Sequence, residues 1–255
     1  MARHLVRSIL ILLILFPVSG MAQVTDARAA RHVFPQFVDG TDDTGDARFR
    51  STLVIQTLAN VDNRCELILE TNVVLTFQDG SITNNSPLHV IDLPPNLFAI
   101  VKTQGTEPLA SGYAVLSCSG EVTALLSYDL AFWIDGELFT IAEATVFSSP
   151  PGTRLQLIND SRGGARLGIA IANDSSNDTV VTVSVFDVEG LQVGSALVEI
   201  PTGSSTAQFL DEIVPSLPAN HIGQIFFDSV QRIHLIGLKF TGVAFTTIMS
   251  TVRVQ

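Results

Sequence analysis

The stretch Val180-Val181-Thr182-Val183-Ser184-Val185-Phe186 decides the fold class of this chain. Apolar side chains alternate in it with small polar ones, the two-residue period of a strand with one buried face. Runs of the same composition recur at 52–55, 73–77 and 232–238, separated by glycine, asparagine, aspartate and proline. A short helix fits only 206–213 and its counterpart after Pro95. The sequence therefore predicts an all-β protein built as a sandwich or barrel.

The composition of the 255 residues excludes several function classes. Only 15% are charged, with 25 acidic against 14 basic side chains and a net charge of -11. The lysines are Lys102 and Lys239, too few for the basic patch that phosphate binding needs. The acidic balance likewise argues against adsorption to an anionic membrane. A hydrophobic content of 46% argues against disorder.

The first 22 residues have the three parts of an export signal. Arg3 and Arg7 precede the apolar run 9–18, and Gly20-Met21-Ala22 places small residues before the expected cleavage after Ala22. The alternative is a membrane anchor, but the run is shorter than the ~20 residues that a spanning helix needs. We expect a secreted protein, extracellular or periplasmic, with no transmembrane segment in the mature chain.

The rest of the chain contains an internal repeat. Four pairs of segments match in the same order: Leu53–Asn60 with Leu167–Asn173, Val73–Gly80 with Val183–Gly190, Ser111–Val115 with Ile222–Phe226, and Phe139–Ala142 with Phe245–Ile248. Such self-similarity indicates repeated structural units. It predicts two tandem immunoglobulin-like β-sandwich domains, 23–148 and 149–255, joined near Ser148–Gly152. The alternative is one large continuous sandwich.

A family resemblance accompanies the repeat. Phe34-Pro35-Gln36-Phe37-Val38-Asp39-Gly40 is followed by Arg50–Ile55 and Asn60, and later by a glycine-containing strand and a terminal Phe-Thr strand. This pattern resembles an exported bacterial β-sandwich module with a Phe-Pro-Gln-x-x-x-Gly lead-in. The resemblance implies the fold and the compartment. That family carries no established activity, so the resemblance implies no catalytic residue.

The two cysteines, Cys65 and Cys118, both lie in the first repeat. In an exported protein such a pair is usually a disulfide, although two unpaired buried thiols remain the alternative. Cys65 is expected in the turn after the first strand and Cys118 at the end of the strand that begins near Tyr113. The equivalent of Cys118 in the second repeat is Ser229, with no cysteine to face it.

No catalytic or transition-metal motif is present. His32, His89, His221 and His234 are far apart and lack HExxH or CxxC spacing, and no GxSxG elbow exists. A Ser/His/Asp triad assembled through space stays open. The carboxylates of a glycosidase must converge on one cleft, whereas those at 129, 135, 137 and 143 are expected on a hairpin facing solvent. No catalytic residue is therefore predicted.

Two local features are candidate binding sites. Asp39, Asp42, Asp43 and Asp46 lie in one glycine-containing loop that could hold calcium through its oxygens, although a solvated acidic loop is the commoner structure. Trp133 precedes the hairpin-turn signal Asp135-Gly136. It could contact a sugar ring or a partner protein there, but packing over the end of the sandwich is favoured. No cofactor other than this candidate calcium is expected.

The sequence thus favours a secreted, non-enzymatic structural or adhesive protein that makes protein or glycan contacts at or outside the cell surface. Strand edges in soluble proteins are usually blunted by lysine, proline or bulges. With two lysines in the chain, an edge that pairs with a partner by strand addition is a physical route to such contacts. The alternatives are a carbohydrate-binding module that uses Trp133 and a hydrolase with an untypical site.

Overall fold

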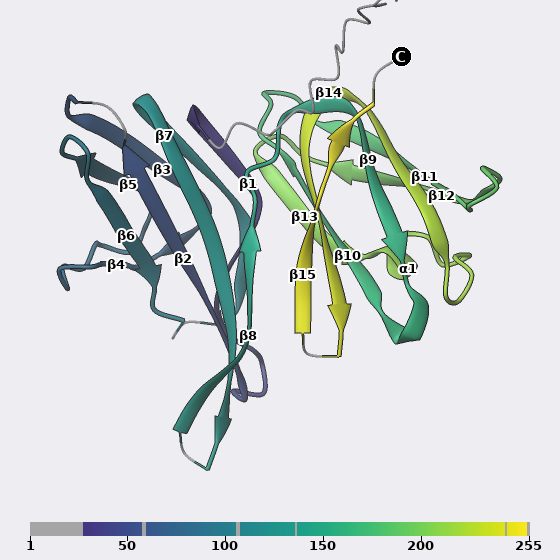
Figure 1. Cartoon of the computed structure of the whole chain (residues 1–255), viewed down its shortest axis with the longest axis horizontal. Helices are drawn as coiled ribbons and strands as arrows, with labels where there is room; N and C mark the ends of the chain where they lie inside the picture. Colours follow the sequence, from purple (N-terminus) through teal and green to yellow (C-terminus); the bar gives the residue numbers. More distant parts are fainter. Residues whose placement is uncertain (1–27, 58–59, 106–107, 136, 243, 254–255) are drawn as a thin grey trace, which may run out of the picture.

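The computed structural model describes residues 28–57, 60–105, 108–135, 137–242 and 244–253. The predicted export signal, residues 1–22, lies outside the described residues. The chain is all-β, and its strands divide into two sets that pair only within themselves (Figure 1). The change from one set to the other falls between residues 146 and 152.

The first half contains eight strands in one antiparallel sheet that curls into a half-barrel. The sheet order is β4-β6-β2-β1-β7-β3-β5, with β8 paired to β7. The strands are β1 (Arg28–Thr41), β2 (Ala47–Thr57), β3 (Asn63–Val73), β4 (Leu75–Phe77), β5 (Ser86–Leu93), β6 (Phe98–Thr103), β7 (Ala110–Ile134) and β8 (Glu137–Val146).

The second half contains the remaining strands and two short helices. They are β9 (Gly152–Asp160), η1 (Arg162–Gly164), β10 (Arg166–Asn173), β11 (Thr179–Phe186), β12 (Gln192–Ile200), β13 (Ser204–Phe209), α1 (Leu210–Ile213), β14 (Ile222–Thr241), β15 (Ala244–Met249) and β16 (Thr251–Val252). Of the predicted helical segment 206–213, only residues 210–213 are helical, as α1, while 206–209 belong to β13. The segment after Pro95 leads through a turn into β6.

One long strand organises each half. β7 pairs with β1, β2, β3 and β8, and β14 pairs with β9, β10, β11 and β15. The outer pairings β3–β5 and β2–β6 likewise correspond to β11–β12 and β10–β13. Because β7 and β14 run through both layers, neither half has the two cleanly separate sheets of an immunoglobulin-type sandwich.

One segment of the predicted repeat alignment is wrong. By strand pairing, β11 corresponds to β3, so Leu67, opposite Leu116, holds the place that Val183 holds opposite Phe227. The segment 73–80 instead spans the end of β3, the short β4 and a turn. β4 has no counterpart among the described strands of the second half. The first half is therefore longer than the second between β3 and β5.

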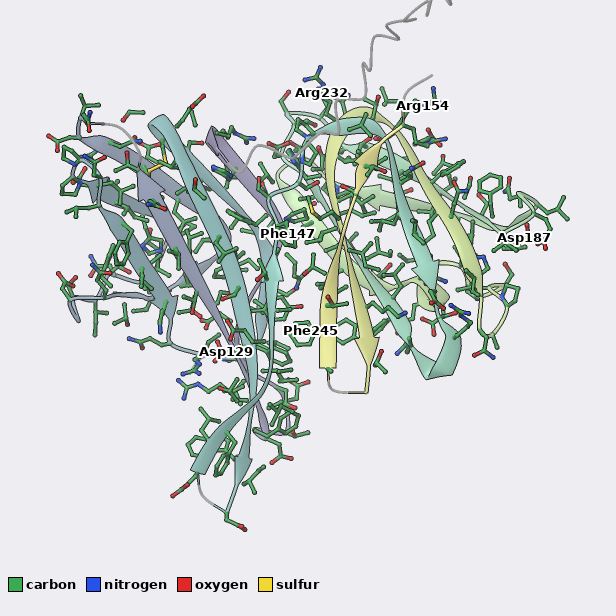
Figure 2. All side chains as sticks on the ribbon, in the orientation of Figure 1. Asp129, Phe147, Arg154, Asp187, Arg232 and Phe245 are labelled. Carbon is green, nitrogen blue, oxygen red and sulfur yellow. A yellow bond between two sulfur atoms is a disulfide. The ribbon has the colours of Figure 1, made fainter. Side chains whose placement is uncertain are left out.

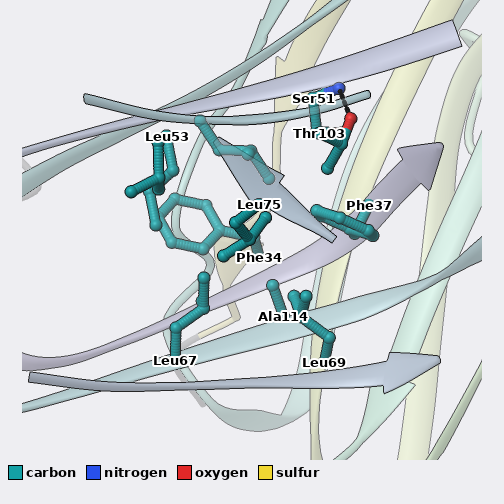
Figure 3. A pocket seen from close by; sticks show the side chains of 11 residues that line it. Phe34, Phe37, Ser51, Leu53, Leu67, Leu69, Leu75, Thr103 and Ala114 are labelled. Carbon is teal, nitrogen blue, oxygen red and sulfur yellow. Dashed lines mark hydrogen bonds between the residues drawn. The ribbon is translucent and has the colours of Figure 1, made fainter. Parts of the chain in front are cut away.

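Each half has its own apolar core, formed by the inward side chains of its alternating strands. Figure 3 shows the core of the first half, where Phe34, Phe37 and Leu75 surround a cavity of about 10 Å³. That volume is at most one water molecule, so the cavity holds no ligand. The first core also includes Ala170 and Leu238, which shows that the second half packs against the first.

The disulfide Cys65–Cys118 is confirmed. Its sequence setting was predicted wrongly, because Cys65 lies within β3 rather than in a turn and Cys118 lies inside β7 rather than at its end. The two residues are opposite one another in the β3–β7 register. The matching pair in the second half is Val181 and Ser229.

Candidate functional site

The hairpin formed by the outer ends of β7 and β8 extends beyond the rest of the first half (Figure 1). We call residues 131–135 and 137–141 the β7–β8 arm. β2 stops supporting β7 at the pair Ala47–Phe132. Beyond it, among the described strands, Trp133 pairs only with Leu138 and Ile134 only with Glu137. The outer arm is therefore a two-stranded ribbon, fixed to its neighbour by a bond from the Trp133 N–H to the Asp46 carbonyl.

Four large apolar side chains on the β7–β8 arm are exposed to solvent. They are Trp133 at 49%, Ile134 at 48%, Phe139 at 46% and Ile141 at 39% exposure. The expectation that Trp133 packs over the end of the sandwich is wrong, because the arm carries it past that end. The sequence signal for the other three is the run of adjacent apolar residues on each side of the turn. Such a run makes both faces of a ribbon apolar.

The acidic loop between β1 and β2 does not gather its carboxylates. Asp39 is buried, accepts the Gly105 N–H at 2.8 Å, and has a pKa raised by burial. Asp42 instead caps the loop by accepting the Thr44 hydroxyl and the Ala47 N–H. Asp43 and Asp46 face solvent. Within the described part of the chain, no three His, Cys, Asp or Glu side chains are grouped to hold a metal ion.

Of the four histidines in the described part of the chain, His32, His89 and His221 each bind a backbone carbonyl at a separate place. His32 Nε2 lies 3.1 Å from the Val122 carbonyl oxygen and His89 Nε2 lies 2.8 Å from that of Ser86. Burial lowers the pKa of both rings. His221 Nε2 lies 3.2 Å from the Phe186 carbonyl oxygen, while its Nδ1 accepts from the Asn159 amide. The His32 contact joins β1 to β7, the His89 contact lies within β5, and the His221 contact ties the segment before β14 to β11; all three side chains are buried.

The fourth histidine lies beside a serine and an aspartate, as a hydrolase requires, but in a different geometry. His234 Nδ1 is 2.6 Å from the carbonyl oxygen of Ser149, not from its hydroxyl. That hydroxyl accepts the Leu235 N–H at 2.9 Å, and the serine is buried. Asp174 lies 3.2 Å from His234 Nε2. Because the ring does not face the hydroxyl, this group lacks the nucleophile–base pair of a triad.

Asp174 and His234, together with Arg31, link the two halves, and we call these three residues the Asp174 clasp. Asp174, in the β10–β11 loop, binds the Arg31 guanidinium on β1 at 2.5 Å as well as His234 on β14. Glu70 of β3 adds a second link by accepting the Ser205 N–H of β13 at 3.2 Å. Sequence reasoning missed this clasp, since Arg31, Asp174 and His234 are 60 or more residues apart.

Replacing Asp174 with asparagine is expected to destabilise the protein by about 2 kcal/mol at pH 7, the usual value for hydrogen bonds to a charged group. The His234 hydrogen bond, with Arg31, lowers the pKa of Asp174 to about 2. A lowered folded-state pKa gives stability that is complete above the unfolded value near 4 and disappears as the pH falls through 2. Urea unfolding from pH 7 to pH 2 should therefore show the two proteins converging in acid. A constant difference over that range contradicts the clasp.

The carboxylates predicted to face solvent do so with one exception. Asp135, Glu137 and Glu143 are exposed, but Asp129 is largely buried and is bound by the Arg50 Nε–H at 3.0 Å (Figure 2). Asp129 therefore neutralises an arginine within the β2–β7 ladder. The exposed three do not share a cleft with it.

The outer strands of the two sheets are open edges. β5 pairs only with β3 and β12 only with β11 among the described strands, and neither contains lysine. Leu88 on β5 and Leu197 on β12 are exposed. Pro87 removes one donor from the β5 edge, whereas β12 has no such block. Unlike the outer part of the β7–β8 arm, both strands are end strands of a sheet with several further strands beside them.

The chain matches no protein-family model and no curated protein. Among the described residues, no helix is long and apolar enough to cross a membrane. The fold therefore defines an all-β sandwich protein with one disulfide. The exposed β7–β8 arm is its candidate functional site.

Proposed function

We propose that this is an exported, non-enzymatic contact protein whose β7–β8 arm binds a second copy of the chain. The observation that carries the proposal is the group of four large apolar side chains exposed on the β7–β8 arm, whose outer end, from Trp133 to the tip, has no third strand among the described residues. Two-stranded hairpins are marginally stable in water, and grouped exposed apolar residues mark contact surfaces. Aromatic side chains that become buried in a contact commonly supply most of its energy, and Trp133 and Phe139 are exposed aromatic residues of this kind.

The charge on the arm favours an antiparallel arrangement of two copies. The acidic residues Asp135 and Glu137 lie at its tip, and the apolar residues lie between the tip and the base. A two-fold axis across the middle of the arm brings apolar side chains together and sends the two acidic tips to opposite ends. The open backbone edge of β8 then allows strand pairing across the contact.

Export and tandem organisation are part of the same proposal. The charged, apolar and small-residue pattern of 1–22 supports export, as does the resemblance to exported bacterial sandwich modules. The disulfide also fits an oxidising compartment. The matching pairings of β7 and β14 support two tandem domains derived from one repeated unit, 23–148 and 149–255. On this proposal, localisation is extracellular or periplasmic.

A variant in which Trp133, Phe139 and Ile141 are all replaced by serine is expected to self-associate about a hundredfold or more weakly, because it lacks three apolar anchors of the contact. Sedimentation velocity from micromolar to hundreds of micromolar protein measures the effect. The wild type should shift from monomer to dimer with concentration, while the triple variant stays monomeric.

The matched control replaces Leu197 and Val180, exposed on β12 and β11, with serine. This double variant should associate like the wild type. All three proteins should have similar melting temperatures, since the substituted side chains lie outside both cores. A wild type that is monomeric at every concentration contradicts the proposal.

A second candidate is a carbohydrate contact, favoured by the half-exposed indole of Trp133 near the tip. Its immediate partner is Leu138 rather than a polar side chain that could bind sugar hydroxyls. Retention on insoluble polysaccharides that is lost in Trp133→Ala, but kept in the control double variant, distinguishes this candidate from self-contact.

A further inference from the structure

A cleft of about 520 Å³ lies between the two halves. One wall consists of β1, β2 and β7, through Val38, Phe49 and Leu130, and the other of β10, β13, β14 and β15. The volume is within the range of sites that bind small organic molecules, and interfaces between domains are common places for them. It is about fifty times larger than the cavity in the first core.

Aromatic rings form a continuous side of this cleft. The Tyr128 ring stacks on Phe245 with centroids 4.9 Å apart, Phe245 stacks on Phe240 at 5.3 Å, and Phe240 meets Phe209 edge-on at 5.4 Å. Phe245 lies between the two halves (Figure 2). Such a row offers a flat apolar surface that suits a ring-bearing molecule.

Two largely buried polar side chains line the cleft without a hydrogen-bond partner in the described part of the chain. Tyr128 is 4% exposed and Gln36 is 8% exposed. Neither the phenol hydroxyl nor the side-chain amide makes a hydrogen bond with any described residue, and their polar atoms are not among the fully buried side-chain atoms that lack a partner, so they remain accessible from the cleft. They offer a hydroxyl donor, an amide donor and an amide acceptor to whatever occupies the cleft.

The lining carries no free charge among the described residues. Its one carboxylate, Glu212, is bound by the Arg166 guanidinium at 3.0 Å and by the Phe209 N–H at 3.1 Å. No lysine or arginine lines the cleft. Burial raises the pKa of Tyr128, so its hydroxyl stays a neutral donor. An anionic ligand therefore finds no counter-ion there, which disfavours fatty-acid carboxylates and phosphates.

We propose that the cleft binds a neutral, ring-bearing organic molecule whose carbonyl or hydroxyl oxygen accepts a hydrogen bond from Tyr128, with Gln36 pairing to a second polar atom. This inference goes beyond the contact function and does not depend on the β7–β8 arm. The molecule is held by aromatic stacking and apolar burial, and the two polar groups orient it.

The test uses Prodan, a neutral naphthalene ketone whose fluorescence reports both apolar surroundings and hydrogen bonding to its carbonyl. Titration of the full-length protein should show saturable, single-site binding with a blue shift. Ala207→Trp places a large ring into the cleft from an exposed position and should abolish binding. Tyr128→Phe keeps the stacked ring and removes one neutral hydrogen bond, which should weaken binding about three- to tenfold.

Val180→Trp is the matched control, because it adds the same ring at an exposed position outside the cleft. It should bind Prodan like the wild type. The anionic naphthalene probe ANS should bind the wild type at least tenfold more weakly than Prodan. Absence of saturable Prodan binding, or equal binding by Ala207→Trp, overturns the proposal. The arm triple variant should retain Prodan binding, so the two proposals fail separately.

Discussion

Replacing Gly223 with alanine is expected to prevent the second half from folding, at a cost of at least about 4 kcal/mol, which is an exceptionally large value for one substitution. Gly223 lies on β14, and an added Cβ would be 1.9 Å from the backbone oxygen of Phe186 on β11. A backbone atom in a ladder cannot rotate away. β11 and β14 must therefore separate, which opens the second core. Soluble yield and the circular dichroism melting curve measure the effect.

Gly112 provides the control, since the sequence repeat places it at the equivalent position of the first half. A Cβ there meets the side chain of Glu70 rather than a backbone atom. The Glu70 carboxylate can turn away, although it then loses its bonds to Tyr113 and Ser205, but the Glu70 Cβ at 2.8 Å cannot, so β3 and β7 must shift slightly. Gly112→Ala should be soluble and destabilised by about 1–3 kcal/mol, the usual cost of overpacking. A Gly223→Ala protein as stable as Gly112→Ala contradicts the described packing of β11 on β14.

Removing the disulfide is expected to lower stability by about 4 kcal/mol, the chain-entropy value for a closed loop of 53 residues. Cys65→Ala with Cys118→Ala should then melt about 10 °C or more below the wild type. The bond joins the beginning of β3 to β7, so its loss also weakens the attachment of β3, and of β5 beside it, to the rest of the sheet. Differential scanning calorimetry gives the shift.

Which unfolding transition changes its melting temperature is as informative as how large the change is. If residues 23–148 and 149–255 are separate domains, the change should fall on the transition of the first half and leave that of the second unchanged. The control is Val181→Ala, which alters the matching position of the second half and should move the other transition. Intact mass before and after reduction should differ by two hydrogens. No mass change on reduction contradicts the bond.

Strand alternation predicted most of the fold, because burial in a sheet repeats every two residues and is written directly in the sequence. Val180–Phe186 and 232–238 are strands, as predicted. The segment 73–77 was predicted as one run but is broken at Val74, where the chain turns from β3 into β4. Because Val74 is itself apolar, the amino-acid composition gives no sign that the strand is interrupted there.

The candidate site was visible only in part. Trp133 and the turn after it can be read from the sequence, but the exposure of Trp133 depends on where β2 begins, at Ala47 opposite Phe132. That length is set by the pairing of distant strands. The cleft and the Asp174 clasp are likewise assembled from residues distant in sequence, such as Gln36 and Phe245, so no local pattern indicates them.

The contact between two β7–β8 arms is tested most directly by cysteine cross-linking. Thr140→Cys adds one thiol on the arm and keeps its apolar side chains, while Val180→Cys adds one at an exposed position on β11. Under mild oxidation, with the native disulfide intact, non-reducing electrophoresis should show a covalent dimer for Thr140→Cys and monomer for Val180→Cys. Equal dimer yields, or none from Thr140→Cys at concentrations where the wild type associates, would contradict the proposed role of the arm.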